Sequence, residues 1–201
     1  MKYVIHRGIT NKYIKENSYC AIKRALMDVN SSGVEFDIRL TKDNVIVLSH
    51  DSIDIESSNY SDIIKKKYLS ILDVILGINT KKILLIDIKV RNNYKRFAKE
   101  IVKYLDDINN KNIYLASFNK KIIKYLKKKT NYKLGYITFK NTKNNNYFEV
   151  INFITLSKNN INKYPNKEIF LWTIHNNNEL EEIKNKFSNI DDYYIIKDKK
   201  E

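Results

Sequence analysis

The sequence predicts an α/β protein: a (β/α)8 TIM barrel with a small hairpin after its second strand. Short apolar runs rich in β-branched and aromatic residues alternate with helical patterns along the 201 residues, which indicates a parallel sheet with crossover helices. The runs number one more than the eight strands of a closed barrel. The link from Leu40 to Val45 is too short for a parallel crossover, so two runs form a hairpin and eight parallel strands remain.

The expected strands are apolar runs bounded by polar or turn-forming residues, at residues 2–6, 34–40, 45–50, 83–89, 113–118, 134–138, 153–157, 169–174 and 193–197. The expected helices are amphipathic patterns at residues 18–29, 69–76, 94–108, 120–129 and 178–187. In the third of these helices Phe97, Ile101, Leu105 and Ile108 form an apolar stripe, which is typical of a helix that covers a sheet. Some outer helices, after the fifth and sixth barrel strands, are expected to be short or missing.

The length of 201 residues favours one barrel domain that spans residues 1–201. No stretch approaches the roughly 20 apolar residues of a membrane span, and charged residues follow Met1 too soon for a signal peptide. We therefore expect a cytoplasmic protein. The lone Cys20, which we expect to pack within a helix, excludes an intrachain disulfide.

The formal net charge of +14 raises the question of nucleic-acid binding. Lysine is spread along the whole chain together with many Asn, Ile and Tyr residues, a bias that AT-rich codons explain. No zinc-finger spacing or RNA-binding aromatic motif accompanies the lysines, so we expect no dedicated nucleic-acid binding. A positive field would still attract anionic substrates or lipid head groups, so peripheral contact with an anionic membrane stays open. The sequence leaves the oligomeric state unknown.

Polar clusters fall near the ends of the expected strands, where the active sites of barrels lie. Glu35 and Asp37 are two residues apart on one strand and therefore point to the same face. A hairpin turn near Asp43-Asn44 pairs residues whose numbers sum to about 87, which places His50 opposite Asp37. His6 ends the first strand and is followed by Arg7-Gly8.

The acids are the candidate metal ligands. Buried together, Glu35 and Asp37 would repel each other unless a cation holds them, and the next inward strand supplies Asp87. Three converging carboxylates form a hard-oxygen site suited to Mg²⁺ or Ca²⁺. The alternative is that these acids cap the barrel strands through salt bridges to basic side chains, namely Arg7, Arg39 or Lys89.

His6 and His50 are the candidate general acid and base, because imidazole titrates near neutrality. Arg7 and Lys89 are candidate phosphate contacts, since a guanidinium binds an oxyanion in two places. Trp172 either forms a wall of the substrate pocket or packs in the barrel core. His175 is expected to be a structural hydrogen-bonding residue.

The chain resembles the glycerophosphodiester phosphodiesterase family. The motifs that carry the resemblance occur in the family's order, as His6-Arg7-Gly8, Glu16-Asn17, Gly33-Val34-Glu35-Phe36-Asp37, Thr41-Lys42-Asp43, His50-Asp51, Asp87-Ile88-Lys89, Ser117-Phe118, Gly135 and Trp172-Thr173. The departures are Asp87 where the family usually has Glu, His175 where it usually has Asn, and Lys197-Asp198 in place of Thr-Asp before Pro. The segment after His50-Asp51 is also short, which leaves the choice of alcohol group open.

The resemblance implies hydrolysis of a glycerophosphodiester or lysophospholipid to glycerol 3-phosphate and an alcohol. A divalent cation would be held by Glu35, Asp37 and Asp87, with His6 and His50 as the acid–base pair. Two alternatives stay open. One is a phospholipase D-like lyase that cyclises lysophospholipid or sphingolipid head groups, and the other is a catalytically inactive barrel that serves as a binding module.

Overall fold

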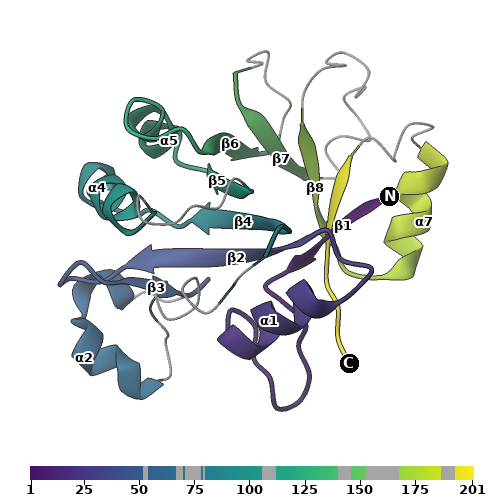
Figure 1. Ribbon diagram of the computed structural model, residues 1–201, viewed down its shortest axis with the longest axis horizontal. Coiled ribbons are helices and arrows are strands. Elements are labelled where there is room, and N and C mark those ends of the chain that lie inside the picture. Colours follow the sequence, from purple (N-terminus) through teal and green to yellow (C-terminus); the bar gives the residue numbers. More distant parts are fainter. Residues whose placement is uncertain are drawn as a thin grey trace.

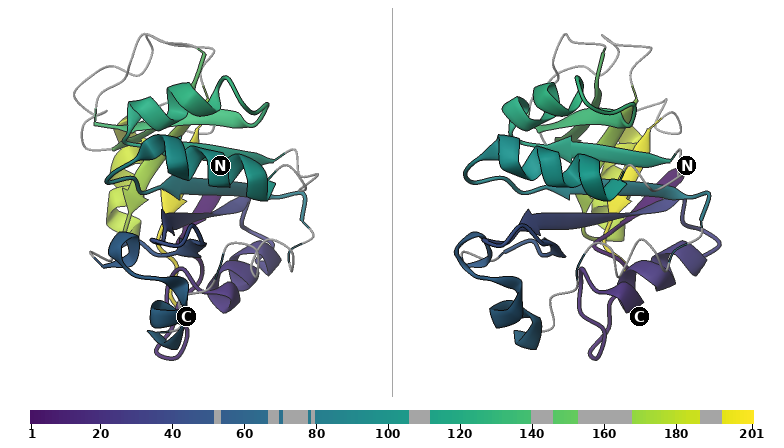
Figure 2. Two further views of the ribbon diagram at one scale, coloured as in Figure 1. Left: turned by 90° about the vertical axis from the view of Figure 1, so that its left-hand side faces the viewer. Right: turned by 60° about the vertical axis from the view of Figure 1, so that its left-hand side comes forward.

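The computed structural model describes residues 1–51, 54–66, 70, 78, 80–105, 112–139, 146–152, 168–186 and 193–201. Its centre is a closed barrel of parallel strands, with helices on the outside (Figures 1 and 2). In order around the barrel, the strands are β1 (Lys2–His6), β2 (Gly33–Leu40), β4 (Ile83–Ile88), β5 (Ile113–Ser117), β6 (Lys133–Thr138), β7 (Phe148–Asn152), β8 (Ile169–Ile174) and β9 (Tyr194–Lys197). The pairing of β1 with both β2 and β9 closes the ring, which confirms the predicted (β/α)8 barrel.

The expected hairpin is formed by β2 and the antiparallel strand β3 (Ile46–Leu48), with Ile38 opposite Leu48. The predicted register is wrong by one residue, because the turn is longer than a two-residue turn and Asn44 adopts a left-handed φ of 68°. As a result Ser49, and not His50, lies opposite Asp37 and donates its backbone N–H to the Asp37 carbonyl at 3.0 Å.

The described helices are α1 (Tyr19–Met27), α2 (Tyr60–Ile63), α4 (Tyr94–Leu105), α5 (Lys120–Leu126) and α7 (Asn177–Lys186), with 3-10 turns at Ile55–Ser57 and Ile64–Lys66. Side chains cap two of them: Ser18 accepts from the Ala21 N–H, and Asn119 from the Lys121 N–H. Cys20 is exposed on α1, so the expectation that it packs is wrong. Apart from Ser70, the expected helix at 69–76 lies outside the described residues, as do most of the segments that follow β6 and β7.

The expected strand at 153–157 also lies outside the described residues, and the strand that pairs with β6 is β7, a few residues earlier. Its position is fixed by Phe148, which packs over Gly135: a Cβ on Gly135 would lie 2.4 Å from the Phe148 ring. The sequence pattern did not reveal this packing, because it depends on a neighbouring strand.

Aromatic rings fill the amino-terminal end of the barrel. The rings of Tyr114, Phe148 and Phe170 lie 5.2–5.4 Å apart, and Tyr194 stacks on Phe170 at 4.4 Å. A second apolar core joins α1, α4 and α5 to the outside of the sheet. Because these rings fill the amino-terminal end of the barrel, a cavity can form only at the carboxyl-terminal end. Within the described residues, no helix has the length and apolar character needed to cross a bilayer.

Candidate active site

A cavity of about 520 Å³ opens at the carboxyl-terminal end of the barrel. One side, from β1, β2 and β4, carries acidic and basic groups. The other side is apolar and is formed by Ala116, Ile137, Val150 and Ile196. All eight predicted site residues line this cavity: His6, Arg7, Glu35, Asp37, His50, Asp87, Lys89 and Trp172.

Glu35, Asp37 and Asp87 meet on the polar side. Asp37 and Asp87 are register neighbours on β2 and β4, and one carboxylate oxygen from each of the three acids lies within 4.8 Å of the others. All three side chains are buried. Burial and then the neighbouring Asp37 raise the pKa of Glu35 well above its usual range. Burial likewise raises the pKa of Asp87 to about 7, although Lys89 acts against it. Although Asp87 is one methylene shorter than Glu, it reaches this cluster.

Two basic side chains pair with the acids, as the alternative interpretation expected. Lys89 Nζ lies 2.6 Å from Asp87 Oδ2 and 3.1 Å from Asp37 Oδ1, and Arg7 Nε lies 3.2 Å from Asp37 Oδ2. Arg39 does not take part, because its guanidinium contacts the His50 carbonyl and Glu56. When all three carboxylates are ionised, these two cations leave the cluster with a net negative charge.

The surroundings of Asp87 Oδ1 test whether this cluster suits a metal ion. It is buried and has no hydrogen-bond partner among the described residues, and a buried polar atom without a partner is costly. A hard divalent cation would both satisfy this oxygen and offset the repulsion between the carboxylates. The donor set therefore fits an oxygen-preferring divalent cation.

The turn after β1 holds the acids in place. Arg7 and Gly8 both have left-handed backbones, with φ of 54° and 87°, and the Arg7 N–H donates to Glu35 Oε2 at 3.2 Å. Only glycine fits at position 8, since a Cβ there would lie 2.5 Å from the Ala21 carbonyl carbon on α1.

Asn17 and Glu16 are functional neighbours to which the sequence reasoning gave no site role. Asn17 donates its side-chain N–H to Asp37 Oδ2 at 2.9 Å and accepts the Asp37 backbone N–H at 3.0 Å. Glu16 accepts from Arg7 Nη1 at 2.9 Å. The signal was present in the Glu16-Asn17 pair, which the sequence analysis used only as a motif.

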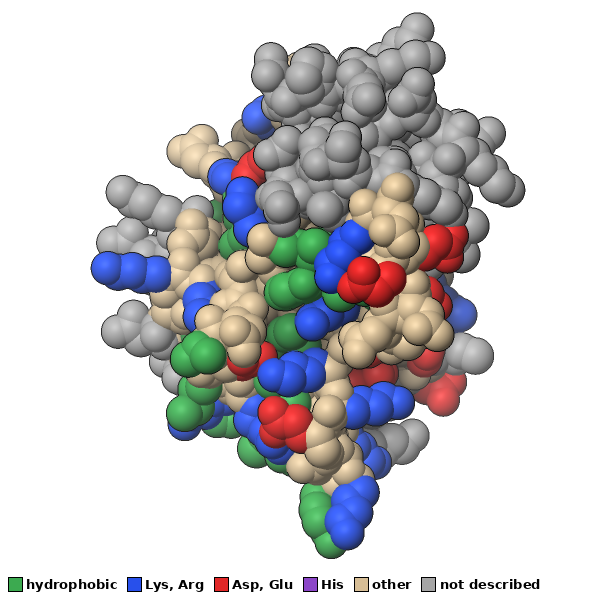
Figure 3. Space-filling model, turned by 90° about the vertical axis from the view of Figure 1, so that its right-hand side faces the viewer, with side chains coloured by type: hydrophobic (Ala, Val, Ile, Leu, Met, Phe, Trp, Pro, Cys, Tyr) green, Lys and Arg blue, Asp and Glu red, His purple; other side chains and the backbone are tan. Residues whose placement is uncertain are grey.

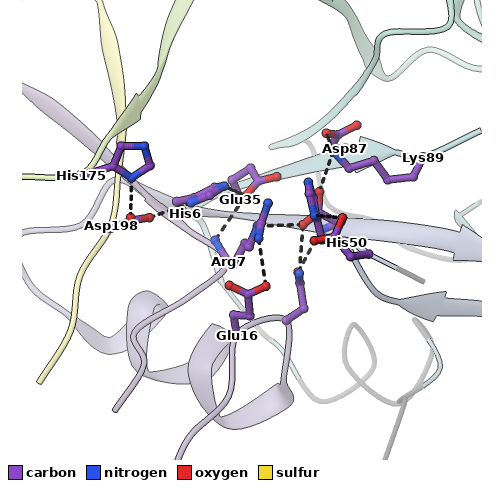
Figure 4. A network of polar contacts seen from close by, with 12 residues as sticks. His6, Arg7, Glu16, Glu35, His50, Asp87, Lys89, His175 and Asp198 are labelled. Atoms are coloured by element: carbon purple, nitrogen blue, oxygen red, sulfur yellow. Dashed lines mark hydrogen bonds and ion pairs between the residues drawn. The ribbon is translucent and has the colours of Figure 1, made fainter. Parts of the chain in front are cut away.

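His6 is held by a carboxylate at the other end of the chain (Figure 4). Its Nδ1 lies 2.7 Å from Asp198 Oδ1, and its Nε2 lies 3.9 Å from Glu35 Oε2. The other oxygen of Asp198 lies 2.8 Å from His175 Nδ1. Burial alone would raise the pKa of Asp198, but the hydrogen bonds with His6 and His175 lower it to about 2. His175 thus has a structural hydrogen bond, and Asp198 is a site residue that the sequence analysis missed.

His50 also has a carboxylate beside its Nδ1 atom, in this case a largely exposed one. Its Nδ1 lies 2.6 Å from Asp51 Oδ1, and this contact with the imidazole lowers the pKa of Asp51. Arg39 fixes the backbone here, since Nε and Nη2 donate to the His50 carbonyl at 2.9 and 2.6 Å. In both imidazoles Nδ1 contacts a carboxylate, so Nε2 is the atom left to exchange a proton with a ligand.

Trp172 combines its two expected roles. The indole N–H donates to the Val150 carbonyl at 3.2 Å, and the ring lies 5.8 Å from the rings of both Phe118 and Phe139. The same side chain lines the cavity. It therefore packs against its neighbours and forms part of the apolar wall.

A parallel eight-stranded barrel with carboxylates, imidazoles and basic groups at its carboxyl-terminal mouth defines the class of TIM-barrel enzyme scaffolds. Residues 6–65 match the glycerophosphoryl diester phosphodiesterase family. A glycerophosphodiester phosphodiesterase of Caldanaerobacter subterraneus subsp. tengcongensis is 37% identical over 62 residues, which cover 31% of this chain and 25% of the relative. The sequence match thus spans about a quarter of that relative's length.

The fold extends the similarity to the whole chain. A glycerophosphodiester phosphodiesterase structure from Parabacteroides distasonis has a TM-score of 0.82 at 19% identity, covering 98% of this chain and 92% of the other. One from Thermotoga maritima has a TM-score of 0.71 at 20% identity, covering 97% and 93%. The family match over residues 6–65 and the shared barrel agree: the amino-terminal third of the chain resembles glycerophosphodiester phosphodiesterases in sequence, and the whole chain shares their fold.

Proposed function

We propose that this chain, as a single barrel domain, uses a divalent cation such as Mg²⁺ or Ca²⁺ to hydrolyse a glycerophosphodiester to glycerol 3-phosphate and an alcohol. A lysophospholipid would be cleaved at the same bond, and its glycerol 3-phosphate product would keep the acyl chain. The observation that carries the proposal is the buried acidic trio with its partnerless Asp87 oxygen, in a cavity also lined by His6 and His50. The family match over residues 6–65 supports the reaction class. A cytoplasmic location stays a prediction.

Glu35, Asp37 and Asp87 would hold the cation, which supplies Lewis-acid stabilisation of the phosphoryl charge when bound. Arg7 and Lys89 already lie against Asp37, so their charges are in place to contact the remaining phosphate oxygens. Asn17 keeps Asp37 oriented through its paired hydrogen bonds.

His6 and His50 would move the protons at their Nε2 atoms. The ionised Asp198 accepts from His6 Nδ1, which keeps the proton on that nitrogen and leaves Nε2 to act as a base when the ring is neutral. It also stabilises the protonated ring, so the same imidazole can donate. Asp51 lies in the equivalent place beside His50 Nδ1. Trp172 and the apolar side of the cavity would exclude water from the part of the substrate that leaves as the alcohol.

The test is turnover of glycerophosphocholine by the purified chain with Mg²⁺ or Ca²⁺, before and after a chelator, followed by phosphorus NMR. We expect glycerol 3-phosphate, loss of turnover with the chelator, and loss in His6→Ala and His50→Ala. A cyclic phosphate product would support the cyclising lyase instead. A folded, metal-loaded protein that cleaves no glycerophosphodiester or lysophospholipid would support the binding module.

A further inference from the structure

The exposed aromatic side chains of this protein gather at one end. Among the described aromatic residues only Tyr13, Phe118 and Phe139 are exposed, at 81, 45 and 55%. Each of them follows the carboxyl end of a barrel strand: β1, β5 and β6. All three therefore lie at the mouth of the cavity, and none of them at the amino-terminal end of the barrel.

The aromatics flank the mouth from opposite sides. In the order of strands around the barrel β1 and β6 are four apart, so the loop that carries Tyr13 leaves the barrel on the side opposite Phe139. Phe118 and Phe139 are 5.8 Å apart and form one apolar edge with Trp172. Tyr13 is held in a tight turn, since Asn11 Oδ1 accepts the N–H groups of Tyr13 and Ile14 at 2.9 Å.

Exposed lysines accompany these aromatics. Lys12 lies with its Nζ 4.9 Å from the centre of the Tyr13 ring. A shallow hollow that shares Thr10, Glu16 and Lys200 with the main cavity is also lined by Lys12 and Lys15. On the other edge Lys120 and Lys121 are exposed in the first turn of α5, two and three residues after Phe118. The acids nearby are engaged internally, with Glu16 on Arg7 and Glu201 on Arg24.

We propose that the mouth of the barrel docks on an anionic lipid surface. Aromatic side chains with lysines beside them suit the boundary between head groups and acyl chains. Docking would place Tyr13 and the Phe118–Phe139 edge in the interface and the lysines against lipid phosphates. It would also open the cavity toward the membrane. The membrane contact stands on its own, whereas its consequence, that the substrate is drawn from the bilayer as a lysophospholipid, rests on the proposed function.

A nucleic acid fits these observations less well. Single strands are bound along a continuous basic groove with stacked bases, whereas here the aromatics stand on two sides of an opening. On the face drawn in Figure 3, basic and acidic side chains are interspersed among the described residues rather than gathered into a band. The net charge of +14 thus favours a broad anionic surface over a linear track.

The test is co-sedimentation of the full chain with phosphatidylcholine vesicles that contain or lack phosphatidylglycerol. We expect binding only with phosphatidylglycerol, and weaker binding at high salt. Tyr13→Ser/Phe139→Ser should weaken it at least about tenfold, and Lys12→Glu/Lys121→Glu by a similar factor. Matched controls are Met27→Ser/Val29→Ser, whose side chains are 72 and 91% exposed at the other end of α1, and Lys127→Glu/Lys129→Glu, which makes the same charge change beyond the end of α5.

The readout does not depend on catalysis, so failure of the docking proposal is distinct from failure of the proposed function. Melting curves establish that each variant is folded. The proposal is overturned if the wild type does not bind anionic vesicles, if binding is independent of phosphatidylglycerol, or if the controls lose affinity as much as the mouth variants. If binding of a single-stranded RNA oligonucleotide depends on Tyr13 and Lys121 while binding of vesicles does not, the surface is assigned to nucleic acid instead.

Discussion

The Nδ1 atom of His6 lies 2.7 Å from Oδ1 of Asp198, although the two residues are 192 positions apart in the sequence. Asp198 directly follows β9 and His6 ends β1, and these neighbouring strands are paired in parallel. The carboxylate therefore fixes both the orientation of the imidazole and the nitrogen that carries its proton.

Replacing this carboxylate should impair proton transfer. We expect Asp198→Asn to lower kcat by about a hundredfold, in the range typical of general acid–base catalysis, with a smaller effect on KM. His175→Asn is the matched control, since it removes the other, exposed imidazole that contacts Asp198. An equal loss in both variants would contradict this role for Asp198.

Removing one acid should weaken the cation site. Asp87→Asn eliminates the carboxylate that has the partnerless oxygen, and we expect its affinity for Mg²⁺ or Ca²⁺ in isothermal titration calorimetry to fall at least about tenfold. Glu168→Gln is the control, because Glu168 pairs with Lys133 toward the other end of the barrel. Unchanged affinity in Asp87→Asn would remove this residue from the proposed ligands.

The metal-free protein should become less stable as the pH rises from about 4 to about 7. Glu35 and Asp87 have raised pKa values in the folded state, in the case of Asp87 about 7. The folded protein therefore binds more protons than the unfolded chain in this window, and stability falls with rising pH. Asp198 acts in the opposite sense, because its lowered pKa removes stability only as the pH falls from about 4 toward 2.

Thermal melts at pH 5 and pH 7.5 test this expectation. Without metal the Tm should be higher at pH 5, and a divalent cation should raise the Tm chiefly at pH 7.5, where the acids are ionised. Asp87→Asn should flatten the pH dependence. A metal-free Tm that rises steadily from pH 5 to pH 7.5 would show that the acids are not destabilising when they are charged.

Arg39 should act on catalysis through the backbone of His50. Its guanidinium donates twice to the His50 carbonyl, so Arg39→Met should let the imidazole shift and lower kcat by about tenfold or more. Lysine cannot reproduce the two-pronged contact, and Arg39→Lys should recover only part of the rate. The exposed Arg91→Met serves as the control in steady-state kinetics, and an equal loss there would contradict a specific effect of Arg39.

The sequence was sufficient to predict most of the barrel, because each strand is a local apolar run and the acids sit at alternating positions on β2. The sequence was insufficient where packing between distant segments sets the register or the position of a strand. The left-handed Asn44 lengthens the hairpin turn and shifts His50 by one position, and Phe148 sets the position of β7 by packing on Gly135. Asp198 was noted only as part of a motif and was given no site role, because its partner His6 is supplied by the opposite end of the chain.

The short ladder between β1 and β2 has a consequence for how the candidate active site is disrupted on heating. It comprises three register pairs, the last of which places His6 beside Glu35. The β1–β2 pairing that closes the barrel is thus also the pairing that aligns the His6 imidazole with the Glu35 carboxylate. Local opening there would separate the two while the remaining strands stay paired. Catalytic activity would then disappear on heating before the far-ultraviolet signal of the barrel changes.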